Sequence, residues 1–169
     1  MSSKATIGLT NPKTPSNVGS IMRASGCYQV DAVFYTGSRY THASKFHTDT
    51  HNAHINIALT PTISLLDTVP EGAKIICVDL VEGAIPLPNF KHPDNAYYIF
   101  GPEDGTIEQS VIDKADDVVY IPTIGSMNLA ATVNVVLYDR LVKTNVVIAD
   151  DELIRNSRDT NNTSKINKD

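Results

Sequence analysis

Asn17 and Arg23 lie six residues apart in the segment PSNVGSIMRAS (15–25), at the predicted start of a helix. Helix amino-termini favour anions, and arginine presents a planar fork that suits a phosphate or a carboxylate. A nucleic-acid phosphate and a carboxylate such as Glu103 would both fit this pair. Taken singly, each residue also has a simpler interpretation, with Asn17 as a helix cap and Arg23 in a surface salt bridge.

A second segment has the same design, IPTIGSMNLAATVNVVLYDRL (121–141), which passes from a strand end through a short loop into an apolar helix. Ser126 and Asn128 lie where the loop meets the helix, so they are either cap residues or polar contacts for a ligand. A third segment, FGPEDG (100–105), places two glycines after another predicted strand. Such glycines either let the backbone approach a flat ligand or simply make tight turns.

Several common ligand sites are excluded by spacing. The chain has no Walker loop and no GxGxxG motif, because the glycines in 100–105 have the wrong spacing and Glu103 would repel a pyrophosphate. The five histidines and two cysteines show no zinc-ligand spacing, so we expect no metal site. The sequence argues against ordinary binding of dinucleotides and nucleoside triphosphates.

The elements that must position these segments alternate along the chain. Short apolar runs predict strands, and apolar residues at helical spacing predict helices between them, which together indicate a parallel α/β sheet. In such a sheet, ligands bind beyond the carboxyl ends of the strands, here after Leu80, Phe100 and Ile121. The predicted strands are 6–11, 31–35, 55–59, 74–80, 96–100 and 117–121, and the predicted helices are 16–26, 62–68, 106–114 and 128–143.

Composition indicates one globular domain over residues 1–149, followed by a polar tail, 150–169, which we expect to be disordered. No apolar run is long enough to cross a membrane, and the first residues lack the apolar core of a signal peptide. Cys27 and Cys77 are expected to be reduced core thiols, which favours a cytoplasmic protein.

The net charge of −5 argues against a protein that coats nucleic acid non-specifically, although it permits a local basic patch. Four basic residues are candidates for such a patch near the amino-terminal end: Arg23, Arg39, Lys45 and His47. The polar segment 39–54 is therefore a possible RNA contact, and its histidines are expected to be surface residues.

The three segments together resemble the three motifs of the SPOUT-class RNA methyltransferases, specifically the TrmH (SpoU) family, in a minimal single-domain form. The first motif, NVGSIMRAS (17–25), is similar to the family's Asn-x-Gly-x-Ile-x-Arg-x-Ala. The second, FGPEDG (100–105), matches with its last glycine one place early, and the third is Ile-Pro at 121–122 followed by SMNLA (126–130). The order holds along nearly the whole chain, whereas the 122–126 loop is short and Ala130 stands where the family often has serine.

The resemblance implies a parallel α/β sheet whose C-terminal half forms a deep trefoil knot, although true knots are otherwise rare. It implies S-adenosylmethionine as the cofactor, methyl transfer to a ribose 2′-hydroxyl, and RNA as the partner, with tRNA favoured and rRNA as the alternative. It implies a catalytic face made by Asn17, Arg23, Glu103, Ser126 and Asn128. It implies cofactor binding by Leu80, Gly101, Glu103, Ile121, Met127, Asn128, Leu129 and Ala130.

The resemblance also implies a homodimer packed through the first and last helices, with the active site at the interface. Four residues of the last helix would then need a partner surface: Val133, Val136, Leu137 and Leu141. Two other functions remain open, a knotted RNA-binding scaffold without activity and a methyltransferase that acts on a small molecule. The joint presence of Asn17, Arg23, Glu103 and Asn128 weighs against the scaffold.

Overall fold

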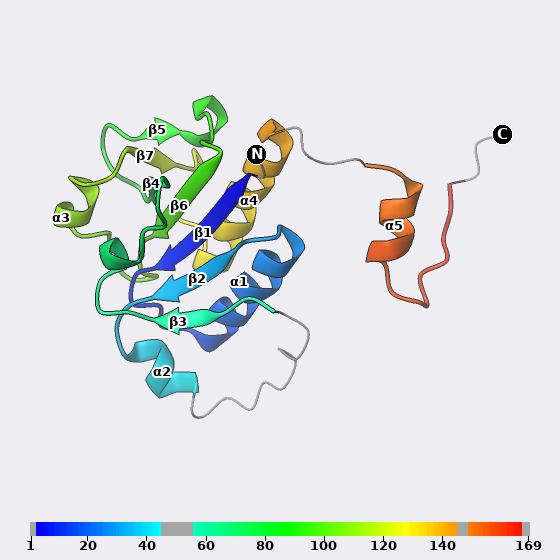
Figure 1. The fold of residues 1–169 in the computed structure, drawn as a ribbon, viewed down its shortest axis with the longest axis horizontal. Coiled ribbons are helices and arrows are strands. Elements are labelled where there is room, and N and C mark those ends of the chain that lie inside the picture. Colours follow the sequence, from blue (N-terminus) through cyan, green and yellow to red (C-terminus); the bar gives the residue numbers. More distant parts are fainter. Residues whose placement is uncertain (1–2, 45–55, 145–148, 167–169) are drawn as a thin grey trace.

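The computed structural model describes residues 3–44, 56–144 and 149–166, and within them seven strands form one sheet (Figure 1). The strand order is β3-β2-β1-β6-β4-β7-β5, and every neighbouring pair runs parallel, which confirms the predicted α/β class. The strands are β1 Lys4–Leu9, β2 Ala32–Tyr35, β3 Leu59–Pro61, β4 Lys74–Val78, β5 Ile85–Pro86, β6 Asn95–Phe100 and β7 Asp117–Tyr120. The trefoil knot stays a prediction.

The helices agree with the predicted ones at both long segments and differ at the short ones. The predicted helix 62–68 is a single 3-10 turn, and 106–114 contains one turn of α-helix, because neither has enough apolar positions for a longer buried face. The proline-containing segment 81–93, predicted as a loop, also contributes the short edge strand β5. The helical elements are α1 Pro15–Cys27, α2 Arg39–Ser44, η2 Leu65–Thr68, η3 Leu87–Asn89, α3 Gln109–Ile112, α4 Leu129–Thr144 and α5 Asp151–Ser157.

The central strands are buried on both faces, and alternate residues enter two separate cores. In β6, Tyr98 and Phe100 join α1 and α4 in the larger core, whereas Tyr97 and Ile99 join η2 and the residues around α3 in the smaller one. Figure 1 shows α1 and α4 side by side against the sheet, and the two helices are in contact. The sheet therefore has a core on each face, and α1 and α4 pack against the larger one.

The exposed apolar stripe of α4 differs from the one expected. Val133, Val136 and Leu137 are buried in the core of their own chain, so they need no partner surface, and Leu141 is half-buried. The apolar residues of α4 that do face outward are Val135, Tyr138 and Val142, which are 37%, 59% and 55% exposed. Both sets have helical spacing, so the apolar pattern did not reveal which stripe faces the sheet.

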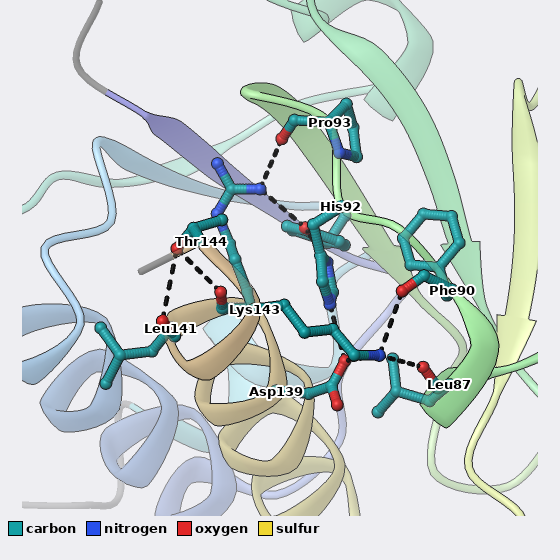
Figure 2. A network of polar contacts seen from close by, with 10 residues as sticks. Leu87, Phe90, His92, Pro93, Asp139, Leu141, Lys143 and Thr144 are labelled. Carbon is teal, nitrogen blue, oxygen red and sulfur yellow. Dashed lines mark hydrogen bonds and ion pairs between the residues drawn. The ribbon is translucent and has the colours of Figure 1, made fainter. Parts of the chain in front are cut away.

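The carboxyl-terminal half of α4 is fixed to the loop before β6 by a polar network (Figure 2). Lys143 Nζ donates hydrogen bonds to the carbonyl oxygens of Leu87, at 2.6 Å, and Phe90, at 3.0 Å. It also pairs with Asp139 at 2.7 Å. Five backbone carbonyls are thus tied to α4, two by Lys143 and three by Arg140, which donates to Pro93 at 2.7 Å, Asp94 at 2.8 Å and Lys4 at 2.9 Å.

His92 is the buried centre of this network. Its Nδ1 lies 2.6 Å from the Tyr98 hydroxyl and its Nε2 lies 2.8 Å from Asp139 Oδ2. Because Arg140 donates to the Tyr98 hydroxyl oxygen at 3.0 Å, that hydroxyl is set to donate its own proton to Nδ1. The chain of donors therefore favours neutral His92 with its proton on Nε2, directed at Asp139.

The structure contradicts one expectation on the cysteines and contains a helix within the polar tail. Cys77 is buried as predicted, and burial, together with the nearby Asp79 charge, raises the pKa of its thiol to about 12. Cys27 is instead exposed at the end of α1. Within the tail, α5 has no buried residue, Asp150 Oδ1 accepts the Leu153 amide, and acidic residues occupy the first turn. The expected disorder of the tail stays a prediction. The domain boundary at 149/150 stays a prediction.

Within residues 3–44, 56–144 and 149–166, no three His, Cys, Asp or Glu side chains are grouped to hold a metal ion. None of the helices seen there is long and apolar enough to cross a membrane. His47, His51 and His54, and the start of the strand predicted at 55–59, lie outside the described residues.

The His92 network predicts a pH-dependent stability. Burial, with the nearby Arg140 and Lys143 charges, lowers the pKa of His92, and together they outweigh the Asp139 carboxylate, which raises it. The unfolded chain therefore binds the proton more tightly than the folded chain. As the pH falls through the ordinary histidine value of about 6.5, the free energy of unfolding should decrease, by at most about 1.4 kcal/mol per pH unit for this one group.

Urea denaturation at about pH 7.5 and about pH 5.5 measures this effect in the wild type and in His92→Gln. His92→Gln should flatten the pH dependence relative to the wild type. An unchanged slope in His92→Gln would show that the stability change arises from other groups.

Candidate functional site

A cavity of about 500 Å³ opens beyond the carboxyl ends of β4, β6 and β7, where the sequence predicted a ligand. Its volume lies within the roughly 300–1,000 Å³ that is usual for small-molecule sites. All three motif segments contribute to its wall. The predicted site residues that line it are Asn17, Leu80, Gly101, Glu103, Ile121, Ser126, Met127, Asn128 and Leu129.

Two predicted site residues do not line this cavity. Arg23 is exposed on α1, and within the described part of the chain no hydrogen bond or ion pair involves its guanidinium. Ala130 is buried in the larger core, where its carbonyl accepts a hydrogen bond from Asn134 of the next turn. The structure of one chain therefore brings together four of the five predicted catalytic residues and leaves Arg23 apart.

Glu103 joins the second motif to the first. Its Oε2 accepts the Lys13 amide at 2.6 Å, and its Oε1 accepts the Thr14 amide at 3.2 Å and the Asn17 side-chain amide at 2.7 Å. Partial burial raises the pKa of Glu103, but these hydrogen bonds outweigh it, so the pKa lies below the ordinary glutamate value. Glu103 is consequently an ionised, fixed carboxylate at neutral pH.

Asn17 and Asn128 were each predicted to be either a helix cap or a contact for a ligand, and the structure gives a different answer for each. Thr14 is the N-cap residue of α1, with Pro15 in the first turn, so Asn17 does not cap its own helix and instead binds Glu103. Asn128 does cap α4, since its Oδ1 accepts the Ala131 amide at 2.8 Å. Asn128 also lines the cavity, and a cap residue there leaves its side-chain NH₂ group available to a ligand.

Asp79 is a site residue that the sequence reasoning missed. It follows β4 directly, and its carboxylate accepts the amides of Leu80 and Ile107, both at 2.8 Å. This carboxylate thereby joins the ends of two loops of the cavity wall. An acidic residue after the apolar run 74–78 was the available signal, because polar residues at the carboxyl ends of parallel strands often face a ligand.

Gly101 is required by this arrangement. A Cβ atom at position 101 would lie only 2.5 Å from Asp79 Oδ2, so any larger residue would displace the carboxylate or the loop. The second glycine of the motif is less constrained, because a Cβ at Gly105 would meet its nearest neighbour, the Pro102 ring, at 3.3 Å. Close approach of side chain to backbone, rather than a special turn, explains the first glycine.

The SpoU rRNA Methylase family model matches residues 4–138, which include all three motifs, all seven strands and the first ten residues of α4. The chain belongs to the SpoU rRNA methylase family, and the resemblance inferred from the motifs is confirmed. A comparison with curated protein sequences finds no significant match.

Solved structures share the fold at low sequence identity. An rRNA methyltransferase from Sinorhizobium meliloti is 15% identical, with a TM-score of 0.68 over 83% of this chain and 56% of its own. The SpoU methyltransferase AviRb from Streptomyces viridochromogenes, in complex with the cofactor AdoMet, is 15% identical, with a TM-score of 0.68 over 85% of this chain and 62% of its own.

A third structure, described as giving insight into 2-OH methylation of C/U34 on tRNA, is 20% identical, with a TM-score of 0.68. The match covers 83% of this chain and 96% of that protein. The chain thus spans less than two thirds of the Sinorhizobium protein and of AviRb, but nearly all of the third protein. At these identities the likeness concerns the fold.

Gly101→Ala should destabilise the protein by about 1–3 kcal/mol, because the added methyl group overlaps the Asp79 carboxylate. Urea denaturation measures the change. Gly105→Ala is the matched control in the same loop and should cost clearly less. Equal effects of the two substitutions would contradict the assignment of Asp79 as the constraint on Gly101.

Proposed function

We propose that this protein is an S-adenosylmethionine-dependent RNA methyltransferase that methylates a ribose 2′-hydroxyl, with tRNA as the first substrate to test and rRNA as the second. The observation that carries the proposal is the convergence of three motif segments on one cavity at the carboxyl edge of a SpoU-family sheet. The match along nearly the full length of the tRNA-methylation structure supports tRNA.

The cavity has the features that the cofactor needs. Leu80, Ile121 and Met127 provide apolar surface for a flat ring, while the backbone around Gly101 and the start of α4 provides polar groups. When bound, S-adenosylmethionine supplies a methyl group activated by its sulfonium charge. The chain itself must place the hydroxyl in line with that methyl group. As the O–C bond forms and the S–C bond breaks, the hydroxyl's proton is released to water.

Glu103 and Asn17 form a hydrogen-bonded pair in the wall of this cavity, and Ser126 and Asn128 also line it. The Glu103 carboxylate accepts three hydrogen bonds. We therefore assign Glu103 a structural role: it holds loops 11–14 and 101–105 together and orients Asn17. Asn17, Ser126 and Asn128 then contact the ribose.

We assign Arg23 to the RNA phosphate rather than to proton transfer, because a guanidinium remains charged at neutral pH and makes a poor base. There it would also stabilise the negative charge that develops on the attacking oxygen. Arg23 lies outside the cavity of its own chain. A homodimer packed through α1 and α4, with the site at the interface, would let Arg23 of one copy serve the cavity of the other.

Arg23→Ala should reduce methyl transfer by about a hundredfold or more, the usual loss when one donor to a developing oxyanion is removed. Binding of S-adenosylmethionine, measured by calorimetry, should stay near the wild-type value because Arg23 does not line the cavity. Arg155→Ala, an exposed arginine of α5, is the matched control and should leave both unchanged. Loss of cofactor binding in a folded Arg23→Ala protein would refute this division of roles.

The dimer proposal rests on the apolar stripe of Val135, Tyr138 and Val142 on α4. Tyr138→Glu should produce a monomer in sedimentation experiments, because a carboxylate cannot be buried in an apolar interface without a partner. Ile63→Glu, at a fully exposed apolar residue far along the chain, should leave the oligomeric state unchanged. A wild-type monomer at micromolar concentration would exclude the dimer.

Two experiments separate the proposed function from its alternatives. Calorimetric titration with S-adenosylmethionine distinguishes an enzyme from a knotted scaffold, which would not bind it. Transfer of labelled methyl groups into total tRNA, ribosomal RNA or a small-molecule fraction distinguishes the substrates. The small-molecule alternative is favoured by the net charge of −5, whereas the family membership favours RNA. A cytoplasmic location stays a prediction from composition.

A further inference from the structure

Arg39, the first residue of α2, belongs to none of the three motifs, yet it binds two segments of the cavity's rim. Its Nη1 lies 2.9 Å and 2.7 Å from the two carboxylate oxygens of Asp104. Its Nε and Nη2 both donate to the carbonyl oxygen of Asn11, at 3.1 Å and 2.5 Å. All three guanidinium nitrogens are therefore engaged, two on the loop after β1 and one on the loop after β6.

Two adjacent carboxylates of loop 101–105, those of Glu103 and Asp104, bind two different segments of the chain. Glu103 binds the amides of Lys13 and Thr14, just before α1, whereas Asp104 binds Arg39 of α2. Arg39 in turn binds Asn11, two residues before Lys13. These contacts close a ring that runs from loop 101–105 through Arg39 to loop 11–14 and back through Glu103.

The start of α2, which carries Arg39, is held against β2. Tyr40 packs edge-on against Tyr35 of β2, with ring centroids 5.2 Å apart. The Tyr35 hydroxyl lies 2.9 Å from Thr41 Oγ1. Asn11 has a φ of 41°, and its side chain occupies the space where a Cβ of Gly37 would lie. The backbone on both sides of the Arg39 contact therefore has little freedom to move.

We propose that Arg39 is a positioning residue for the cavity: through Asp104 and Asn11 it sets the distance between loops 101–105 and 11–14, and so the placement of the Glu103–Asn17 pair. This inference rests on the proposed function for its catalytic consequence, but the ring of contacts exists independently of it. Arg39 is 31% exposed and Asp104 50% exposed, so water and salt reach the pair.

The same geometry assigns the Arg39 guanidinium to this internal role rather than to an RNA phosphate. A phosphate would have to displace the Asp104 carboxylate, which already occupies one edge of the fork, and the other edge is turned to Asn11. Of the basic residues considered for RNA contact, Arg39 is thus already neutralised. The hydrogen bond to Arg39 is the main cause that lowers the pKa of Asp104.

The experiment compares Arg39→Ala, Asp104→Asn and the double variant. Amide hydrogen exchange at Lys13 and Thr14, which donate to Glu103, reports on the ring without any need for activity. Both single variants should speed this exchange, and both should weaken binding of S-adenosylmethionine by about three- to tenfold, the range of a partly exposed charged pair with two-point contact. The double variant should resemble the singles, because both break the same ring.

Lys74→Ala and Asp116→Asn are the matched controls. This pair is also an exposed ion pair, at 2.8 Å, but it lies at the amino end of β4, away from the cavity. Both controls should leave exchange at Lys13 and Thr14 and cofactor affinity as in the wild type. Arg39→Lys keeps the charge but cannot bridge Asp104 and Asn11 with separate nitrogens, so it should restore only part of the affinity.

Three results would overturn the proposal. The first is unchanged exchange at Lys13 and Thr14 in Arg39→Ala. The second is additive effects of the two substitutions. The third is tighter RNA binding in Asp104→Asn together with weaker RNA binding in Arg39→Ala, which would assign the guanidinium to a phosphate. If the wild type transfers no methyl group at all, the proposed function fails, but the exchange data still decide the role of Arg39. Asp104→Asn keeps size and shape and serves if Arg39→Ala does not fold.

Discussion

The site depends on one carboxylate that joins the ends of two adjacent parallel strands. β1 and β6 pair in register, with Leu9 opposite Phe100, so the loops that follow them leave the sheet at the same level. Glu103 on one loop then reaches the amides just before α1 on the other. Those amides precede a helix and have no intrahelical partners, so an ionised carboxylate is a suitable acceptor for them. Without this contact, no side chain of the second motif would bind the segment 13–17, which carries the start of the first motif.

The fold and most of the cavity wall were accessible from the sequence because both follow from local patterns. The apolar runs in β4, β6 and β7 place Leu80, Gly101 and Ile121 at one edge, and parallel topology gives that edge its function. Local patterns do not show which face of a helix packs against the sheet. The apolar residues of α4 form two stripes, and only packing against the sheet shows that Val136 is buried whereas Tyr138 is exposed.

Contacts between distant segments were inaccessible for a different reason. Asp79 and Arg39 lie outside the three motifs, and each has its role through a contact with a residue distant in the sequence. Asp79 binds Ile107, 28 positions away, and Arg39 binds Asp104, 65 positions away. Gly101 was noted as a glycine that lets the backbone come close to a ligand, but its actual neighbour is a side chain of the protein. Arg23 is the opposite case. It belongs to the first motif, but within the described ranges its side chain has no partner, so its predicted role comes from the motif and not from the structure of one chain.

The two ends of α4 show how the rest of the fold supports this edge. Its amino-terminal end carries Asn128 and borders the cavity, whereas its carboxyl-terminal end is held by the network of His92, Asp139, Arg140 and Lys143. A helix of 16 residues is about 24 Å long and stiff, so fixing one end also fixes the other. The buried network at the amino edge of the sheet therefore positions Asn128 at the opposite edge. The cavity wall made by α4 is thus held from the opposite edge of the sheet, whereas the wall made by loops 11–14 and 101–105 is held locally, by the contacts of Glu103 and Arg39.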